Sequence, residues 1–178
     1  MDKNREQPEW TGQEELRDLV YRGGKVPGYK IAKNGLVISY KVKKIDGKVM
    51  KWTQRSKTND YPAVSLQVPE ELVGHAINKE AIKYRRSAKG FVEKVVNVHI
   101  LVADAWLDTN NNCPEHLKPW WDNLCTDLKK ELRQYFFIDH INNDTWDPHV
   151  YNLGFVSTRH NNHHIKMAMQ KEVIKNSS

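Results

Sequence analysis

The sequence predicts an α+β protein in which an N-terminal antiparallel β-sheet with helices precedes a smaller C-terminal unit of two strands and a helix. Short β-branched runs separated by Asn-Gly and Asp-Gly pairs predict the sheet, because these pairs form tight hairpin turns. Segments with apolar residues at helical spacing predict the helices. The length of 178 residues allows one compact domain or two small ones. We expect three parts, which are residues 1–107, 108–134 and 135–178.

The first expected element is a short helix. Thr11 and Glu14 have the spacing of a capping box, in which each side chain bonds the backbone N–H of the other residue. A short helix through Leu16, Leu19 and Val20 should follow, and Gly23-Gly24 would end it. We expect this helix to pack on the sheet that follows.

A β-meander is expected in the next part of the chain. Strands are predicted over Tyr29–Ile31, Leu36–Ser39 and Asp60–Leu66, which are rich in β-branched and aromatic residues. Turns are predicted at Asn34-Gly35 and Asp46-Gly47, because both pairs favour hairpin turns.

Basic residues are concentrated in this meander, and the formal net charge of the chain is +6. A positive surface favours a polyanionic partner, since bound cations release the counterions condensed on nucleic acid. The cluster is either an ordinary solvated sheet face or a sheet laid on the DNA backbone or in a groove. For the second alternative the candidate DNA-binding residues are Lys41, Lys43, Lys44, Lys48, Lys51, Arg55 and Lys57, together with Arg85, Arg86 and Arg159.

Residues 69–95 are expected to be an insertion, either a mobile basic loop that orders on DNA or a peripheral helical excursion. The next segment, Val96–Leu107, predicts an apolar helix with Val98 and Leu101 on one face. His99 lies in that helix, and a histidine in such a place is more often a buried hydrogen-bonding residue than a catalyst.

Residues 108–134 contain a further helix candidate. Four apolar residues spaced by four predict an amphipathic helix that covers the core, with Trp120 or Trp121 packed on it. The four residues are Trp120, Leu124, Leu128 and Leu132.

The two cysteines, Cys113 and Cys125, do not make a secreted disulfide scaffold. Together with His116 they could bind zinc, but this spacing is a weak signal and a fourth ligand is missing. The chain starts with polar and charged residues and has no apolar run of membrane-spanning length. We therefore expect a cytoplasmic protein with no membrane partner.

The residues that carry chemistry lie in the last third of the chain. Tyr135–Ile138 predicts a strand, a polar loop of turn formers follows, and Leu153–Val156 predicts a second strand. Ser157 can cap a helix that begins near Thr158.

Oxygen and imidazole donors converge in this unit. Asp139 and His140 follow the first strand, Asn152 precedes the second, and Asn161 lies in the expected helix. Such donors without cysteines suit a hard divalent ion beside a neutral base. The nearby histidines could be a solvated helix face or could bind a transition metal loosely, and they are His160, His163 and His164.

This unit resembles the ββα-metal module of HNH endonucleases, especially the phage homing enzymes. The family signature is Asp-His, a loop, Asn-Leu, an aromatic residue, Val with Ser or Thr, and a helix carrying Asn. Its counterparts here are Asp139-His140, Asn152-Leu153, Phe155–Ser157 and Asn161. The stretches GYKIAKNGLVIS and VHILVADAWL look like the N-terminal module often fused to these enzymes, with Ile100 where the family usually has Arg.

The resemblance implies a role for each residue. His140 is the general base that takes a proton from the attacking water, because an imidazole titrates near neutral pH. Asp139 and Asn161 hold a single Mg²⁺ or Mn²⁺ ion. Asn152 belongs to this catalytic set as a brace across the loop and not as a ligand, since its amide both donates and accepts.

The resemblance also implies the reaction and the partner. The expected reaction is hydrolysis of a phosphodiester bond in double-stranded DNA that leaves a 3′ hydroxyl and a 5′ phosphate. A monomer would nick one strand, and a transient dimer would cut both. A phage-encoded protein of this kind would act in the cytoplasm of the host cell.

Two alternatives and one geometric condition stay open. The chain could be a non-catalytic nucleic-acid-binding protein on a relic HNH fold, or a zinc-stabilised interaction module around its cysteines. Adjacent residues on a strand point to opposite faces. Asp139 and His140 can therefore serve one site only if the strand ends or bends there.

Overall fold

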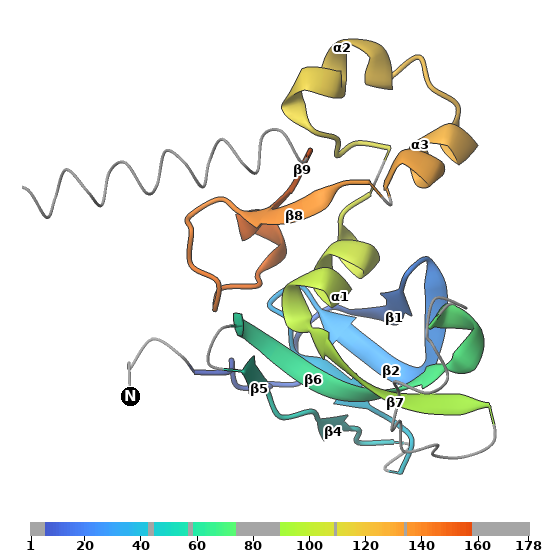
Figure 1. The fold of residues 1–178 in the computed structure, drawn as a ribbon. Helices are drawn as coiled ribbons and strands as arrows, with labels where there is room; N and C mark the ends of the chain where they lie inside the picture. Colours follow the sequence, from blue (N-terminus) through green and yellow to red (C-terminus); the bar gives the residue numbers. More distant parts are fainter. Residues whose placement is uncertain are drawn as a thin grey trace, which may run out of the picture.

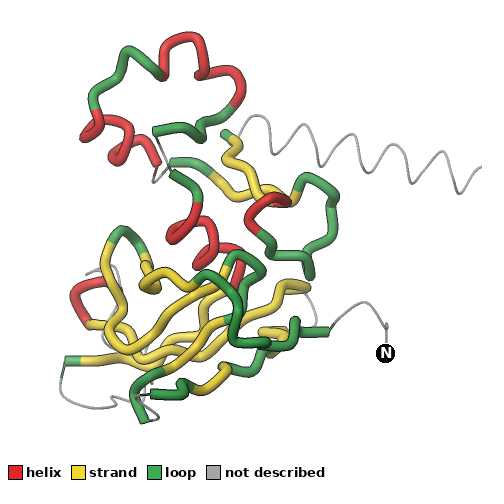
Figure 2. The backbone as a smooth tube through the Cα atoms, turned by 180° about the vertical axis from the view of Figure 1, so that it is seen from behind, coloured by secondary structure: helices red, strands yellow, loops and turns green. Residues whose placement is uncertain are grey.

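The fold is known here from a computed structural model that describes residues 6–42, 45–56, 59–73, 90–108, 110–133 and 135–157. Within these ranges, helix α1 (Val98–Trp106) has two larger antiparallel sheets on one side and a small two-stranded sheet on the other (Figures 1 and 2). The described helices include none that is both long enough and apolar enough to cross a membrane.

The first sheet has the strand order β1-β2-β3-β4. The turns predicted at Asn34-Gly35 and Asp46-Gly47 are confirmed, because they join β2 to β3 and β3 to β4. Gly35 and Gly47 have φ angles of 87° and 68°, a region that glycine enters without a steric penalty. The strands are β1 (Leu16–Tyr21), β2 (Gly24–Ala32), β3 (Val37–Ser39) and β4 (Lys48–Val49).

β1 stands where the sequence predicted a short helix, so that prediction is wrong. The backbone N–H of Thr11 donates to Glu14 Oε1 at 3.0 Å, and the capping pair therefore forms without a helix behind it. Leu19 and Tyr21 are buried two residues apart, which is the spacing of a strand with one face on the core. Pairing with β2 and burial of these side chains outweigh the local helix signal.

The second sheet consists of β5 (Thr53–Ser56), β6 (Asn59–Pro69) and β7 (Phe91–Asn97), in that order. The strand predicted over Asp60–Leu66 is confirmed as part of β6. β7 was not expected, because its residues fall largely in the predicted insertion. They pair with β6 in continuous antiparallel register from Ala63↔Asn97 to Pro69↔Phe91. A short 3-10 helix, η1 (Glu70–Leu72), follows β6, and residues 74–89 lie outside the described part of the chain.

α1 begins directly after β7 and packs on β1 and β6. Leu101 and Val102 have no exposed surface, and they join the side chains of both larger sheets in one hydrophobic core. Burial of this apolar face is the main contribution that holds helix and sheets together. The apolar helix predicted from the sequence is confirmed, with its start at Val98.

Residues 110–133 form two short helices in place of the single amphipathic helix predicted there. After η2 (Glu115–Leu117), α2 (Lys118–Trp121) ends in a turn, and α3 (Thr126–Arg133) starts anew. Trp121 is 2% exposed and contacts Phe136 with ring centroids 5.6 Å apart, whereas Trp120 is 63% exposed. Trp121 is thus the tryptophan that packs inward.

The third sheet is the hairpin of β8 (Phe137–His140) and β9 (Leu153–Val156), with η3 (Val150–Asn152) just before β9. Both predicted strands are confirmed, although β8 starts two residues later than Tyr135 and includes Asp139 and His140. The helix expected from Thr158 lies outside the described residues.

The loop of this hairpin is hydrogen-bonded to the N-terminal sheets. The backbone N–H of Val150 donates to the Lys33 carbonyl at 2.9 Å, in the turn after β2. Trp146 Nε1 donates to Asp60 Oδ1 at 3.1 Å, on β6. These contacts place the loop between β8 and β9 against the edge of both larger sheets.

A second attachment is a largely buried ion pair between α3 and α1. Arg133 Nη2 lies 3.0 Å from Asp104 Oδ1, and the two side chains are 19% and 13% exposed. The backbone N–H of Arg22 donates to the other carboxylate oxygen at 3.1 Å. Burial raises the pKa of Asp104 and lowers the pKa of Arg133, because it disfavours both charged forms. The attraction between the two groups opposes both shifts but is the smaller effect.

Candidate active site at the β8–β9 hairpin

Asp139 and His140 occupy the last two positions of β8. They pair with Gly154 and Leu153 across the hairpin, so their side chains leave the sheet on opposite faces. β8 ends at His140, which is where the sequence required the strand to end if both residues serve one site. The two groups can meet only around that strand end.

The face of Asp139 is open. A Cβ added to Gly154, its partner across the hairpin, would have nothing within 4 Å. Asp139 is half-buried. Within the described part of the chain, nothing therefore fills the space beside Gly154 on the face that carries Asp139.

His140 is enclosed on the other face. It is 4% exposed, and its Nε2 is buried with no hydrogen-bond partner among the described residues. The ring packs against His99 of α1 and Tyr61 of β6, with centroids 5.0 Å and 5.6 Å away. The candidate base is therefore packed against one residue of β6 and one of α1.

Burial lowers the pKa of His140, because a charged imidazolium is poorly solvated there. The carboxylates of Asp139, Asp147 and Asp144 act in the opposite direction, so all three lie within electrostatic reach of the ring. A lowered pKa keeps the imidazole neutral at neutral pH, which is the form that accepts a proton.

Asn152 is 8% exposed and spans the loop. Its Oδ1 accepts from the backbone N–H of Asn142 at 2.9 Å, and its Nδ2 donates to the Asp147 carbonyl at 2.8 Å. The backbone carbonyl of Asn152 also accepts from Ile141 N at 2.8 Å. These bonds act as the brace that the sequence predicted for Asn152, and they fix the chain directly after His140.

The rest of the loop is held by its own polar side chains. Asn142 Oδ1 accepts from Asp144 N at 2.8 Å, and Asp144 Oδ1 accepts from Trp146 N at 2.9 Å. Asp147 Oδ2 accepts from Asn142 Nδ2 at 3.1 Å. These local turns make the loop a compact support for the end of β8.

Lys41, one of the predicted DNA-binding cations, lies flat on the N-terminal sheets. Its Nζ is 4.8 Å from the ring centroid of Tyr29 and 4.7 Å from that of Phe91. It donates to the Gln67 carbonyl at 3.4 Å, and burial lowers its pKa. This lysine is engaged by the protein itself.

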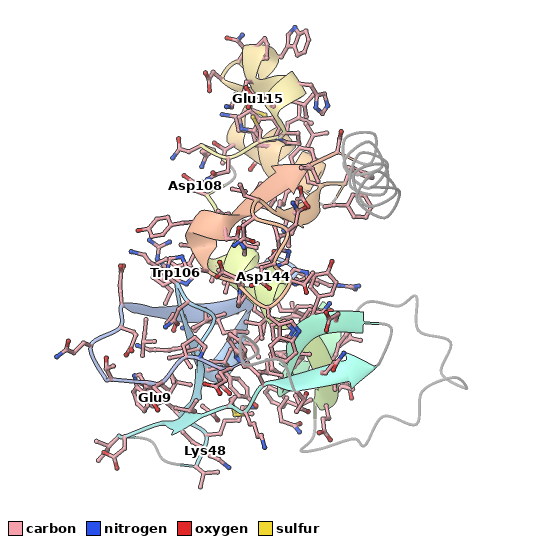
Figure 3. The ribbon with its side chains drawn as sticks, turned by 90° about the vertical axis from the view of Figure 1, so that its left-hand side faces the viewer. Glu9, Lys48, Trp106, Asp108, Glu115 and Asp144 are labelled. Carbon is pink, nitrogen blue, oxygen red and sulfur yellow. The ribbon has the colours of Figure 1, made fainter. Side chains whose placement is uncertain are left out.

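Lys48 and Lys51 are exposed on and just after β4. Figure 3 places Lys48 far from Asp144 of the site loop, on the other side of the N-terminal sheets. Of the predicted DNA-binding cations, Lys41 and Lys48 therefore do not lie beside His140. The Arg55 side chain lies outside the described part of the chain, as do Lys43, Lys44, Lys57, Arg85, Arg86, Arg159 and the whole segment with Asn161, His160, His163 and His164.

Among the described residues, no group of three or more His, Cys, Asp or Glu side chains is placed to hold a metal ion. Cys113, His116 and Cys125 are all described, so these three do not form the zinc site considered from the sequence, and both cysteines are free. At the hairpin the residue that fits a hard cation is Asp139, an oxygen donor with open space beside it.

His99 and Tyr61 are the site residues that sequence reasoning missed. His99 is 7% exposed, and its Nδ1 has no hydrogen-bond partner among the described residues. It is buried as expected, and its ring packs directly against the candidate base. The available signal was a histidine on an otherwise apolar helix face, where an imidazole needs a polar partner from another element. The ring that His99 contacts, His140, lies 41 positions away along the chain, and no local sequence pattern reveals this contact.

The buried state of His99 makes stability depend on pH. Burial lowers the pKa of His99 to about 3, with a smaller contribution from His140. The unfolded chain binds this proton near its ordinary pKa, so the stabilisation is complete above that value and is lost as the pH falls toward 3. Urea unfolding should show a loss of about 2 kcal/mol between pH 7 and pH 5 from this residue. The same measurement on His99→Phe should give a flatter pH dependence, and an unchanged slope would contradict the assignment.

Comparison with known proteins gives one similar structure. No protein-family model matches the sequence, and no curated protein matches it. Among solved structures, a chain described as "DNA binding and cleavage by the HNH homing endonuclease I-HmuI" is 20% identical. The similarity covers 91% of this chain and 68% of that chain, with a TM-score of 0.46. A functional proposal therefore has to rest on the residues of the site.

Proposed function

We propose that the protein is a metal-dependent endonuclease that hydrolyses phosphodiester bonds in double-stranded DNA. The observation that carries the proposal is the end of β8. There a buried, neutral His140 follows a carboxylate with open space beside it, and Asn152 braces the loop that leaves the strand. These features support the roles that the Asp-His and Asn-Leu motifs suggest for the three residues.

In this proposal each residue has one task. His140 accepts the proton of the attacking water, Asp139 provides a cation ligand together with Asn161 of the C-terminal segment, and Asn152 keeps the loop in place. The bound Mg²⁺ or Mn²⁺ would supply charge stabilisation at the scissile phosphate and at the leaving 3′ oxygen. The proton taken by His140 returns to solvent after the bond is cut.

The charge of the chain supports DNA as the partner. The formal net charge is +6, and Lys48 and Lys51 are exposed on and just after β4. One site per chain makes nicking the simplest outcome, and a transient dimer would be required to cut both strands.

The test is nicking of supercoiled plasmid with Mg²⁺ or Mn²⁺ and with EDTA. Nicking should require the metal, and Asp139→Asn should lower it by at least about 100-fold or raise the metal concentration it needs. Asp18→Asn is the matched control, because Asp18 forms an exposed ion pair with Lys25 on the first sheet. The wild-type protein without metal-dependent nicking, or Asp139→Asn at full rate, would reject the proposal.

A second candidate function is DNA or RNA binding without catalysis, on a relic of the same fold. The enclosure of His140, which is 4% exposed, favours this alternative, since a general base must reach water. Fluorescence anisotropy with labelled duplexes separates the two candidates. Tight binding without product under any divalent metal would leave only the binding function.

A further inference from the structure

Three rings from three separate elements meet at the candidate base. Tyr61 lies on β6, His99 is the second residue of α1, and His140 ends β8. The ring centroids of Tyr61 and His99 are 4.6 Å apart, and those of His99 and His140 are 5.0 Å apart. The three rings therefore connect the hairpin to β6 and α1 at His140, the residue proposed to accept a proton.

Each imidazole in this cluster has one buried nitrogen that has no hydrogen-bond partner among the described residues. The two atoms are Nδ1 of His99 and Nε2 of His140, on side chains that are 7% and 4% exposed. A buried polar atom left unpaired costs about 1–3 kcal/mol, so such atoms are rarely left without a partner. Nδ1 of His140 is not among these buried, unpaired atoms.

The separation and angle of the two rings suit a direct bond between them. Centroids 5.0 Å apart allow facing ring nitrogens to approach to about 3 Å, which is hydrogen-bond distance. The planes meet at 80°, so the edge of one ring faces the other. The two nitrogens are not hydrogen-bonded to each other in this arrangement, and a bond between them would require a ring to rotate about its Cβ–Cγ bond. Each unpaired atom can thus satisfy its counterpart.

One of the two nitrogens must donate and the other must accept, because a neutral imidazole has one N–H and one lone pair. Burial keeps the pKa of His99 at about 3, so His99 is neutral and can accept. If His140 donates from Nε2, its Nδ1 keeps a lone pair. If His140 accepts at Nε2, its proton sits on Nδ1 and no nitrogen is left to act as a base.

We propose that His99 is a positioning residue that accepts, at Nδ1, a hydrogen bond from Nε2–H of His140, and so holds His140 in the tautomer whose Nδ1 is the base. This inference rests on the proposed nuclease function and deepens it. During the reaction Nδ1 of His140 takes the proton of the attacking water, and the resulting imidazolium keeps its Nε2–H bonded to His99. The hydroxide oxygen forms the new bond to phosphorus as the bond to the 3′ oxygen breaks. The leaving 3′ oxygen takes a proton from solvent to become the 3′ hydroxyl, and Nδ1 of His140 gives its proton back to solvent.

Tyr61 completes the arrangement by restricting ring motion. Its ring packs on both imidazoles, at 4.6 Å from His99 and 5.6 Å from His140, in tilted geometry. A hydrogen bond between two imidazoles is sensitive to rotation, so packing on both rings keeps the two nitrogens aligned. Tyr61 acts through the histidines and is not expected to touch DNA.

The first experiment compares two substitutions of His99 under single-turnover conditions. His99→Phe keeps the ring but removes the acceptor, and it should slow cleavage about 10–100-fold, the usual loss when the partner of a functional imidazole is removed. His99→Gln keeps an acceptor oxygen and should recover part of that loss. DNA affinity should be unchanged in both, and the exposed His116→Gln is the control. Equal cleavage by His99→Phe and wild type would overturn the positioning role.

The second experiment is ¹⁵N NMR of the histidine rings in the full chain, which does not depend on cleavage. His140 should carry its proton on Nε2 in the wild type and should lose this preference in His99→Phe. A proton on Nδ1, or the same tautomer in both proteins, would overturn the inference. A wild-type protein that shows the bonded tautomer but does not nick DNA would reject the nuclease proposal and keep the hydrogen bond.

Discussion

Replacing His140 with Ala should lower the rate of DNA cleavage by at least about 100-fold, the lower end of what a positioned general base contributes. The physical reason is the loss of the imidazole that follows Asp139 at the end of β8, whose lowered pKa keeps it neutral. DNA affinity should stay within about twofold of wild type, because the electrostatic contacts that dominate binding are made by basic residues. Plasmid nicking and fluorescence anisotropy on the same preparations measure the two effects.

The side chain of His140 is buried, so its removal also affects folding. Thermal unfolding should therefore accompany the kinetics, and His140→Gln offers a variant of closer volume that still lacks a base. His116→Ala is a matched histidine control at an exposed position. A folded His140→Gln protein that nicks DNA at the wild-type rate would exclude His140 as the base.

Breaking the Arg133–Asp104 ion pair should cost about 3–5 kcal/mol of unfolding free energy, the usual range when one partner of a buried pair is removed. Arg133→Ala leaves the Asp104 carboxylate largely buried without its cation, and it also removes the guanidinium that lies 4.2 Å from the Phe155 ring centroid. Asp104→Ala strands the Arg133 guanidinium in the same way. The midpoint and slope of urea unfolding measure the loss.

The double variant Asp104→Leu with Arg133→Leu separates charge from packing. It should be more stable than either single variant, because neither charge is then buried without a partner. The exposed pair of Asp18 and Lys25 is the control, and its removal should shift the midpoint far less. Single variants at positions 104 and 133 that unfold at the wild-type midpoint would show that this pair does not stabilise the attachment of α3.

The elements that sequence patterns predicted correctly are those whose signals are local. The Asn34-Gly35 turn requires a positive φ angle, and Gly35 has a φ angle of 87°. β9 matches Leu153–Val156 at both ends, because a short apolar run lies between a polar loop and a polar residue. α1 is apolar on several sides, as expected for a helix with sheets on one side and the hairpin on the other.

The elements that were missed are those decided by distant partners. The Thr11–Glu14 pair just before β1 is a local helix signal. The residues of β1 nevertheless form a strand, because they pair with β2. The residues of β7 lie next to a basic segment and gave no clear strand signal. They form a strand because they pair with β6 along their whole length. The single helix predicted through Leu124 is broken into α2 and α3, since Trp121 and not Trp120 turns inward.

For the candidate site, the motif found the hairpin but not its surroundings. Asp139, His140 and Asn152 could be singled out because their types and order carry chemistry. His99 and Tyr61 could not, since their importance comes only from the packing that sets them against His140. Contacts between residues far apart in the chain cannot be predicted from local sequence patterns.

The attachment of the hairpin limits how this protein could be recombined. Two strands of four residues each are marginal alone in water, and the imidazole at the end of β8 packs on rings from β6 and α1. A chimaera that exchanged only residues 135–157 would leave that imidazole among foreign neighbours, with neither its acceptor nor its packing. A chimaera that keeps the surroundings of His140 must therefore include Tyr61 and His99 together with the hairpin. The segment that has to be transferred is thus much longer than the Asp-His and Asn-Leu motifs.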